Sequence, residues 1–494
     1  MQSWISCILW LLFTWVWVKA LKSFSRGSIK LPPGPTPWPI IGNLPQLGHK
    51  PHKSLADLAK VHGPIMSLKI GQVTTVVISS ASMAKQVLQD HDAALCNRNV
   101  PDSVSSHQKG EYGIPWLPAS TQWKKLRKIC NLHIFTSQKL DANQDLRRKK
   151  IQQLVAFVQE SCHAGEAIDI GQAAFDTAVN LLSNTIFSVD LADPNSASAR
   201  EFKNLMWGLM VESGKPNVSD FFPMLRKLDI QGVRRRLSRH HIKILEVLDR
   251  FIYQRLKQRQ EHGFVGSKDM LDTLLNISES EKIDRNDFKH LFLDLFAAGA
   301  ETTSSTLEWA LTELVHSPEA LSKARSELEK QIGKGNPMEE SDIARLPYLQ
   351  AVVKETLRLH PAVPLLIPRK ASVDVQISGF IVPKGAQVLV NAWAIGRDAS
   401  TWENPYSFKP ERFLGLDVDV KGRNFELIPF GAGRRICPGL PLAIRMLHLM
   451  LGSLIKSFDW KLESKVTTEN MDMEEKFGIT LQKAQPLRVV PVAI

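Results

Sequence analysis

Apolar residues recur at every third or fourth position along most of this chain, a period that predicts amphipathic helices. The longest such segments cover residues 143–161, 241–262, 284–316, 346–359 and 440–457. Two regions have strand-like patterns instead: residues 65–79, where Gly71 separates two apolar runs as in a hairpin, and residues 373–390. The sequence shows no internal repeat, low-complexity tract or linker after residue 40. We therefore predict a mainly α fold with a minor β region, in a single domain over residues 41–494.

The amino-terminal segment has a different pattern. Its first eighteen residues are mostly apolar and include no charged side chain, which just reaches the ~17–25 residues that span a bilayer. Lys19, Lys22, Arg26 and Lys30 follow, and basic residues at this position keep the downstream chain in the cytosol. No small-residue cleavage site ends the apolar run, so an uncleaved anchor is favoured over a signal peptide. We predict a single-pass anchor at residues 1–21 and a basic, proline-rich linker at residues 22–40.

Charge and cysteine content narrow the possible functions. The formal net charge is +12, from 62 basic and 50 acidic residues, a surplus that suits nucleic acid, an anionic membrane or an acidic protein. The chain lacks zinc-finger spacing, a basic zipper and aromatic–basic interleaving, which argues against nucleic acid. Five widely spaced cysteines favour a reducing compartment over a disulfide framework. Without a Walker A loop or a strand-associated GxGxxG, the sequence predicts no nicotinamide or flavin site of its own.

One cysteine has a distinctive setting. Cys437 follows a glycine-rich stretch and stands just before the predicted helix at residues 440–457. The free N–H groups and dipole of a helix start stabilise a thiolate and lower its pKa, which makes the sulfur a metal ligand. Gly431, Gly433 and Gly439 permit unusual backbone conformations and a close approach by a flat ligand. Arg435 can reach an anionic group on that ligand. An iron porphyrin meets these demands, and a cysteinate ligand favours O–O cleavage.

Residues 430–439 read FGAGRRICPG and resemble the haem-binding signature of the cytochrome P450 family. The alternative is a glycine loop with a structural cysteine. The resemblance implies the fold of that family and haem b bound through Cys437 as metal ligand, with O₂ as co-substrate. It also implies cofactor contacts from Phe430, Gly433, Arg435 and Gly439.

Three further motifs stand in the order expected for this family. Trp123 and Arg127, four residues apart, share one helix face, and the resemblance implies that they and Arg369 bind the haem propionates. Glu301 and Thr302 lie in the middle of the helix predicted at residues 284–316. The resemblance implies that Thr302 binds oxygen and that Glu301 relays the protons which O–O cleavage in a dry pocket requires. A solvated polar face is the alternative for this pair.

The third motif is structural. Glu355 and Arg358 are three residues apart on a predicted helix, close enough for an ion pair. The resemblance implies that Arg412 completes a buried network with them beneath the cysteine loop. Loss of one member would leave buried charge uncompensated.

The resemblance also implies partners. Electrons would come from NADPH through a separate NADPH-cytochrome reductase, a flavoprotein of the endoplasmic reticulum membrane, with the basic surplus steering the encounter. Residues 216–232 and 302–310 resemble plant terpenoid hydroxylases of the geraniol hydroxylase and ferruginol synthase group, although Glu301 stands where that group usually has aspartate.

The substrate pocket is predicted to be apolar, which favours a lipophilic substrate. Plain core packing is the alternative for each of its residues, which are Ile114, Trp116, Met206, Met210, Phe292, Phe296, Ala297, Val363, Leu366 and Ile479. We predict oxidation of a mono- or diterpenoid. The rival functions are a flavonoid or phenolic hydroxylase, a haem-thiolate isomerase or dehydratase, and a haem or sterol binder without catalysis.

Overall fold

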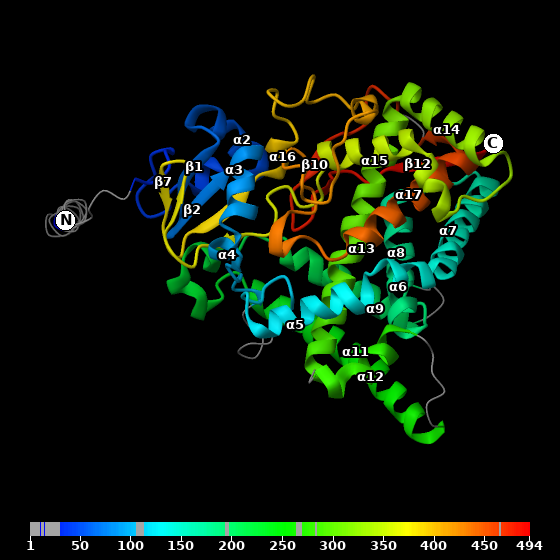
Figure 1. Cartoon of the computed structure of the whole chain (residues 1–494), viewed down its shortest axis with the longest axis horizontal. Coiled ribbons are helices and arrows are strands. Elements are labelled where there is room, and N and C mark those ends of the chain that lie inside the picture. The colour runs from blue at the N-terminus through cyan, green and yellow to red at the C-terminus, as the bar shows by residue number, and fades with distance from the viewer. Residues whose placement is uncertain are drawn as a thin grey trace, which may run out of the picture.

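The fold is seen in a computed structural model that describes residues 10, 14, 30–104, 113–192, 197–262, 269–281, 284–463 and 466–494. The predicted anchor, apart from residues 10 and 14, and residues 22–29 of the predicted linker lie outside the described residues. The described chain has a sheet-rich part formed by its blue and yellow segments and a larger helix-rich part formed by the remainder (Figure 1).

Helices make up most of the described chain. They are α2 (Pro51–His62), α3 (Ala81–Lys85), α4 (Asp92–Leu95), α5 (Thr121–Ile129), α6 (Ser137–Ala142), α7 (Gln144–Ala164), α8 (Ile170–Phe187), α9 (Ala197–Ser213), α10 (Val218–Phe221), α11 (Val233–His262), α12 (Met270–Glu281), α13 (Arg285–His316), α14 (Pro318–Ile332), α15 (Pro347–Leu359), α16 (Ala392–Ile395) and α17 (Leu440–Ser457). The five long helices predicted from the apolar period are α7, α11, α13, α15 and α17. All but α11 begin within a residue of prediction, and α11 begins eight residues earlier than residue 241.

Both predicted β regions form strands. The main sheet has the order β1-β2-β8-β5-β3, from strands β1 (Ile65–Ile70), β2 (Val73–Ile78), β3 (Asn97–Arg98), β5 (Arg369–Lys370) and β8 (Gln387–Val390). Strands β1 and β2 form the predicted antiparallel hairpin, with Ile65 opposite Ile78 and Gly71 in the turn at φ 59°. Smaller sheets contain β4 (Ile168–Asp169), β6 (Val375–Ile377), β7 (Phe380–Val382), β9 (Phe458–Leu462), β10 (Glu475–Lys476), β11 (Gln482–Lys483) and β12 (Arg488–Ala493).

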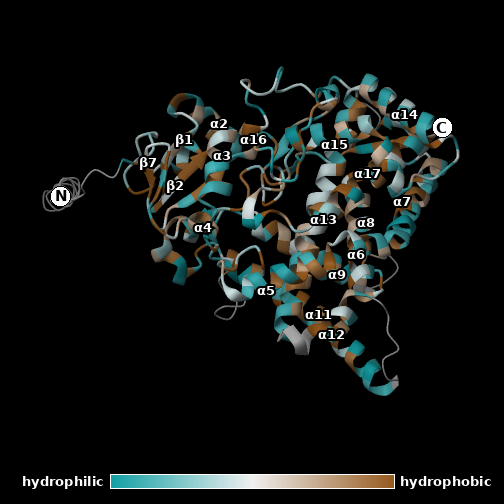
Figure 2. Ribbon diagram, viewed as in Figure 1, coloured by the Kyte–Doolittle hydropathy of each residue, from teal (hydrophilic) through white to brown (hydrophobic). Residues whose placement is uncertain are grey.

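Helix α13 organises the helix-rich part. It packs along α8, and its two halves belong to different hydrophobic clusters. Its first half, residues 288–300, packs with residues of α5, α8, α9, α11 and α12, whereas residues 307–315 pack with α14, α15 and α17. Figure 2 shows strands β1 and β2 as largely hydrophobic, while the peripheral helices α7 and α14 carry hydrophilic residues on their outer faces. A long central helix with small residues at its middle therefore separates two cores.

Helix α17 is also a core element. Within the described ranges it is the one helix long and apolar enough to cross a membrane, and 56% of it is buried inside the protein. Gly439 forms its N-cap and Pro441 occupies its first turn, a position where proline is tolerated because its missing N–H would have no intrahelical partner. This start fixes the position of the cysteine loop relative to the core.

Candidate active site

A cavity of about 290 Å³ lies between α13, α17, α5 and α8. Cys437 and Thr302 both line it, although they are 135 positions apart in the sequence (437 − 302). Its apolar lining includes Ile114, Leu181, Leu182, Leu291, Leu295, Val363, Leu366, Ile367 and Leu442. The cavity therefore combines a sulfur ligand, a hydroxyl group and an apolar wall.

The cysteine loop is held by its own backbone. The Cys437 N–H donates to the Phe430 carbonyl at 3.0 Å, and Leu440 begins α17 three residues later. Burial raises the pKa of the Cys437 thiol, while the Gly439 and Leu440 backbone N–H groups and the Arg127 charge act in the opposite direction. The helix start thus favours the thiolate as predicted, but burial outweighs it, so the expected net lowering of the pKa is wrong.

Two of the three glycines need to be glycine. Gly431 and Gly433 have φ values of 70° and 69°, which favour glycine. A Cβ on Gly433 would overlap the Leu88 carbonyl oxygen and press on Asp92. Gly439 has an ordinary φ of −80°, so the expectation of an unusual backbone conformation is wrong there. Its place beside the Cys437 sulfur is still close, because an added Cβ would lie 3.8 Å from Sγ.

Four arginines, Arg98, Arg127, Arg369 and Arg435, line the same cavity. Arg98 and Arg369 stand directly opposite each other in the β3–β5 pair, an arrangement in which like charges destabilise a sheet. Within the described residues Asp92 is the one carboxylate paired with any of them, 2.8 Å from Arg369 Nη1. The cavity therefore has a surplus of positive charge.

The electrostatics reflect this surplus. Burial, together with repulsion from Arg369 and Arg435, lowers the pKa of Arg98 well below its usual range. Burial also lowers the pKa of Arg435 to about 10. Arg435 donates to the carbonyls of Cys96, Ile114 and Leu117 at 2.9, 3.2 and 2.6 Å, an arrangement that orients its guanidinium group without neutralising it.

This side of the cavity fits an anionic prosthetic group. The buried indole Nε1 of Trp123 has no hydrogen-bond partner among the described residues, and such orphaned donors call for an acceptor. The Arg435 guanidinium stacks 4.3 Å from the centre of the Trp123 ring. A flat molecule with two carboxylates would satisfy the indole and the arginine surplus, with its plane beside the Cys437 sulfur. Sequence reasoning missed Arg98, because the pairing of its short strand β3 with β5, which brings it opposite Arg369, is visible only in the folded structure.

Helix α13 separates the two residues of the predicted proton relay. Thr302 lines the cavity, and its hydroxyl donates to the Ala298 carbonyl at 2.6 Å. Glu301 is buried outside the cavity lining, where it accepts from Thr480 Oγ1 at 3.1 Å and from Gln482 Nε2 at 2.6 Å. Burial raises the pKa of Glu301 to about 7. The pair is therefore adjacent in sequence but faces different surroundings.

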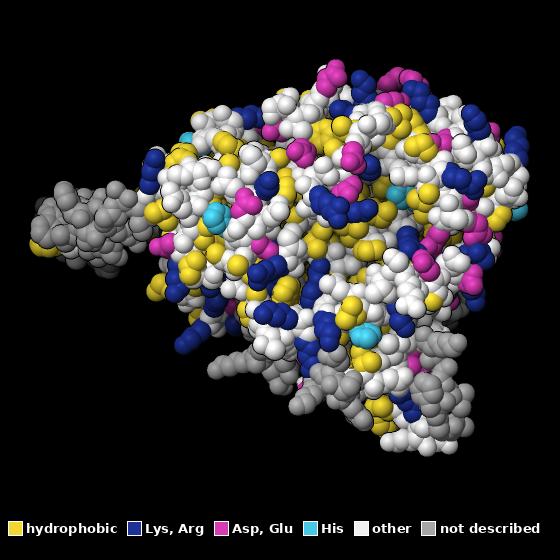
Figure 3. Space-filling model, viewed as in Figure 1, with side chains coloured by type: hydrophobic (Ala, Val, Ile, Leu, Met, Phe, Trp, Pro, Cys, Tyr) yellow, Lys and Arg dark blue, Asp and Glu magenta, His cyan; other side chains and the backbone are white. Residues whose placement is uncertain are grey.

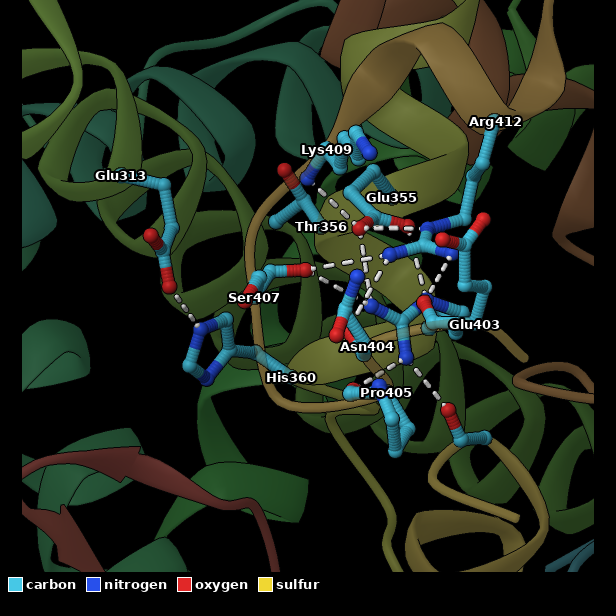
Figure 4. A network of polar contacts seen from close by, with 12 residues as sticks. Glu313, Glu355, Thr356, His360, Glu403, Asn404, Pro405, Ser407, Lys409 and Arg412 are labelled. Atoms are coloured by element: carbon cyan, nitrogen blue, oxygen red, sulfur yellow. Dashed lines mark hydrogen bonds and ion pairs between the residues drawn. The ribbon is translucent and has the colours of Figure 1, made fainter. Parts of the chain in front are cut away.

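Behind the site, Glu355, Arg358 and Arg412 form a buried network, termed the Glu355 network; Glu355 and Arg412 are labelled in Figure 4. The Glu355 carboxylate accepts from Arg358 Nε at 2.7 Å and Nη2 at 2.8 Å, and from Arg412 Nε at 2.9 Å. Arg358 also donates to the carbonyls of Gly396 and Pro405 at 2.5 and 2.7 Å. The network thereby ties α15 to the long segment that leads to the cysteine loop.

The predicted substrate residues divide into two groups. Ile114, Val363 and Leu366 line the cavity. Phe292 and Phe296 are fully buried against Phe187, on the other side of α13. The remaining residues also lie outside the lining: Met206, Met210 and Ala297 pack in or against the core, Trp116 is half-buried, and Ile479 is 37% exposed. For these seven a place in the substrate pocket stays a prediction, with core packing as the alternative for the buried ones.

Together, the helical fold and the cysteine-bearing cavity define a protein of the haem-thiolate class. Residues 32–488 match the family model Cytochrome P450. The chain is 56% identical over 481 residues to geraniol 8-hydroxylase of Swertia mussotii, covering 97% of each chain. It is 54% identical over 492 residues to geraniol 8-hydroxylase of Catharanthus roseus, covering 99% of each. It is 53% identical over 476 residues to drimenol monooxygenase of Persicaria hydropiper, covering 96% of this chain and 94% of the relative. The chain belongs to the cytochrome P450 family and is a monooxygenase.

Proposed function

We propose that this monooxygenase binds haem b through Cys437 and inserts oxygen into a lipophilic terpenoid. The observation that carries the substrate class is the similarity, over nearly the whole chain, to two geraniol 8-hydroxylases and a drimenol monooxygenase. The apolar cavity wall supports it, because a hydrocarbon skeleton held by few polar contacts fits such a surface.

The proposed haem contacts follow from the surplus charge. Trp123 Nε1 and the guanidinium groups of Arg98, Arg127, Arg369 and Arg435 would hold the two propionates. Gly431 and Gly439 would leave room beside the ring, and Phe430 lies in the same cavity lining. Gly433 would act indirectly, because its missing side chain lets the loop pack against the Leu88 carbonyl oxygen. When bound, the haem supplies activation of O₂ with electrons from NADPH. The Glu355 network would keep the cysteine loop in place without touching the ring.

The proposed proton delivery uses α13. Thr302 holds its hydroxyl at the cavity, where it would be free to turn from the Ala298 carbonyl and donate a proton or a hydrogen bond into the cavity. Glu301 has a pKa of about 7, so it can both take up and release a proton near neutral pH. Because its carboxyl group is bound by Thr480 and Gln482, delivery would require the side chain to leave these partners or to act through water. The protons are consumed when dioxygen is cleaved and one atom leaves as water.

The partner and location are part of the same proposal. A separate NADPH-cytochrome reductase would supply the electrons, and the apolar amino terminus would hold the enzyme on the endoplasmic reticulum with its domain in the cytosol. Lys and Arg side chains gather over α5 on the face seen in Figure 3, where Lys124 and Lys128 are exposed and the same helix carries Trp123 and Arg127 at the cavity. A basic surface directly outside the cavity suits an acidic electron donor. Reduction by the reductase should slow as ionic strength rises; an unchanged rate would contradict this docking surface.

Two measurements test the core of the proposal. The reduced, carbon-monoxide-treated protein should show the absorption of a thiolate-ligated haem, and Cys437→Ser should lose it; Cys162→Ser, at a half-buried cysteine outside the cavity lining, is the matched control. The protein with reductase and NADPH should then oxidise members of a terpenoid panel. Turnover of phenolic compounds alone would contradict the proposed terpenoid substrate class. An unaltered spectrum in Cys437→Ser would contradict the assignment of Cys437 as the haem ligand.

A further inference from the structure

Asp294 is an unexpected residue in an apolar cavity. Among the described residues that line the cavity it is the one carboxylate. It lies on α13 eight positions before Thr302, which corresponds to about 12 Å along the helix at 1.5 Å per residue. Leu291, Leu295 and Ala298 line the cavity from the same helix face. A polar group therefore stands beside an apolar strip that runs along α13 to Thr302.

Only half of this carboxyl group is used by the protein. Oδ2 accepts from the Ile114 N–H at 2.7 Å, while Oδ1 accepts no hydrogen bond from the described part of the chain. Gly113 makes the close approach possible, because an added Cβ there would overlap the carboxyl group. Burial raises the pKa of Asp294 to about 7. A secluded oxygen with an unmade hydrogen bond is costly unless a ligand completes it.

We propose that Asp294 selects an oxygenated substrate by accepting a hydrogen bond from its hydroxyl group at Oδ1. This inference rests on the proposed terpenoid oxidation and names the substrate class more closely, as a terpenoid alcohol. The remainder of the molecule lies along Leu295 and Ala298 toward Thr302. The carbon that is oxidised is then remote from the hydroxyl group.

The dimensions agree with this arrangement. An acyclic terpenoid alcohol with eight bonds between its hydroxyl oxygen and its far carbon spans roughly 10 Å, because each single bond of about 1.5 Å advances less than its full length along a zigzag chain. That is close to the distance along α13 between Asp294 and Thr302. Geraniol and drimenol, in the names of the similar enzymes, are both alcohols.

A purely structural role must be separated from selection, because the Asp294–Ile114 bond also fixes the loop before α5. Asp294→Asn makes this separation. Its amide oxygen replaces Oδ2 as acceptor for the Ile114 N–H, and its NH₂ group replaces Oδ1 at the cavity. An ionised carboxylate can accept a hydrogen bond from an alcohol but not from its methyl ether, which has no O–H group. An NH₂ group can donate a hydrogen bond to the oxygen of either compound.

The experiment compares kcat/KM for an acyclic terpenoid alcohol and its methyl ether at pH 8, with reductase and NADPH. The native enzyme should prefer the alcohol roughly 10- to 100-fold, the range expected for one hydrogen bond to a charged group. Asp294→Asn should reduce this preference to within about threefold, with product still formed. Leu295→Ala is the control, since it should lower kcat/KM for both substrates and leave the ratio of the two values unchanged.

The outcomes are distinct. A preference for the alcohol that survives in Asp294→Asn would show that the methyl group is rejected sterically and would overturn the inference. Equal kcat/KM values for the two compounds in the native enzyme would overturn it as well, while leaving terpenoid oxidation intact. If the native enzyme oxidised neither compound nor any other terpenoid, the proposed function would fail and the inference with it.

Discussion

Replacing Glu355 by glutamine is the most direct test of the Glu355 network. The Glu355 and Arg358 side chains are 0% exposed and that of Arg412 is 8% exposed. The carboxylate accepts from both guanidinium groups and from the Lys409 N–H at 2.8 Å. Glutamine preserves the shape of the side chain. It removes the negative charge and places an NH₂ group against a guanidinium donor.

The magnitude follows from burial. Two guanidinium cations would remain in the interior with backbone carbonyls but no carboxylate, and breaking a buried ion pair in this way costs about 3–5 kcal/mol. Glu403→Gln is the matched control, because Glu403 is exposed and contacts Arg412 through its backbone carbonyl. An exposed charge change of this kind should stay within about 0.5 kcal/mol.

The assay is urea unfolding of the purified full-length protein, followed by tryptophan fluorescence and by the absorbance of the bound haem. Glu355→Gln should lower the free energy of unfolding by about 3–5 kcal/mol and reduce the haem retained per protein. A loss under about 1 kcal/mol, similar to that of Glu403→Gln, would mean that the backbone carbonyls alone stabilise the two arginines. The stabilising role of the Glu355 carboxylate would then be refuted.

Three other substitutions test the site and its surroundings. Gly433→Ala should cost more stability in urea than Gly335→Ala, because both glycines have positive φ but a Cβ has open space at Gly335 and meets the Leu88 carbonyl oxygen at Gly433; equal losses would contradict this. Glu301 has a folded pKa of about 7, above its unfolded value, so its stabilising contribution is full in acid and is lost as pH rises toward 7. Glu301→Gln should therefore gain up to about 3 kcal/mol relative to the native protein between pH 4.5 and 8, and a constant difference across that range would refute the shift. Burial alone would raise the pKa of Glu475, but the His360 imidazole 3.8 Å away, the hydrogen bond with His52 at 3.1 Å and the charge of Lys53 hold this pKa well below its usual range. The stabilisation that the Glu475 carboxylate contributes is present above its unfolded pKa and is lost as pH falls below that value. Glu475→Gln should therefore be less stable than the native protein at pH 7 and should flatten the acid side of the stability curve. Urea midpoints at several pH values measure this.

Much of the fold could be predicted because local pattern and tertiary packing agree. The apolar period located α7, α13, α15 and α17, since each buries one or more faces against the core. The hairpin at residues 65–79 was equally clear, because two apolar runs flank Gly71. The start of α11 could not be predicted from the apolar period, since residues 233–240 are rich in arginine and histidine and their helix is set by tertiary contacts.

The candidate site shows where sequence reasoning loses resolution. The cysteine loop and the Glu355–Arg358 pair are short motifs whose residues are spaced by local geometry, so the sequence could place them, whereas Arg412 was placed by the family resemblance alone. Residues of the substrate wall are different, because each belongs to one side of a helix. At about 100° per residue, Leu291, Leu295, Ala298 and Thr302 share a face of α13. Phe296 lies about 120° from Thr302, so the period itself could have assigned it to the core. Phe292 lies about 80° away, which is also the offset of Asp294 on the other side, so the period could not decide between core and cavity for Phe292.

Helical period, however, cannot find a residue whose importance arises from chain segments that meet only on folding. Arg98 becomes notable because β3 and β5 bring it opposite Arg369, and Asp294 because the loop carrying Ile114 uses only one of its oxygens. In both cases the signal is an imbalance of charge or hydrogen bonding that exists only in the assembled cavity. Such imbalances stay tolerable when a ligand corrects them. The arginine surplus thus points to an anionic group beside Cys437, and the open oxygen of Asp294 points to a hydroxyl group about 12 Å along α13 from Thr302. The cavity accordingly carries determinants of two kinds, arginines for the cofactor and Asp294 for the substrate, and both meet at Ile114, whose carbonyl accepts from Arg435 and whose N–H donates to Asp294.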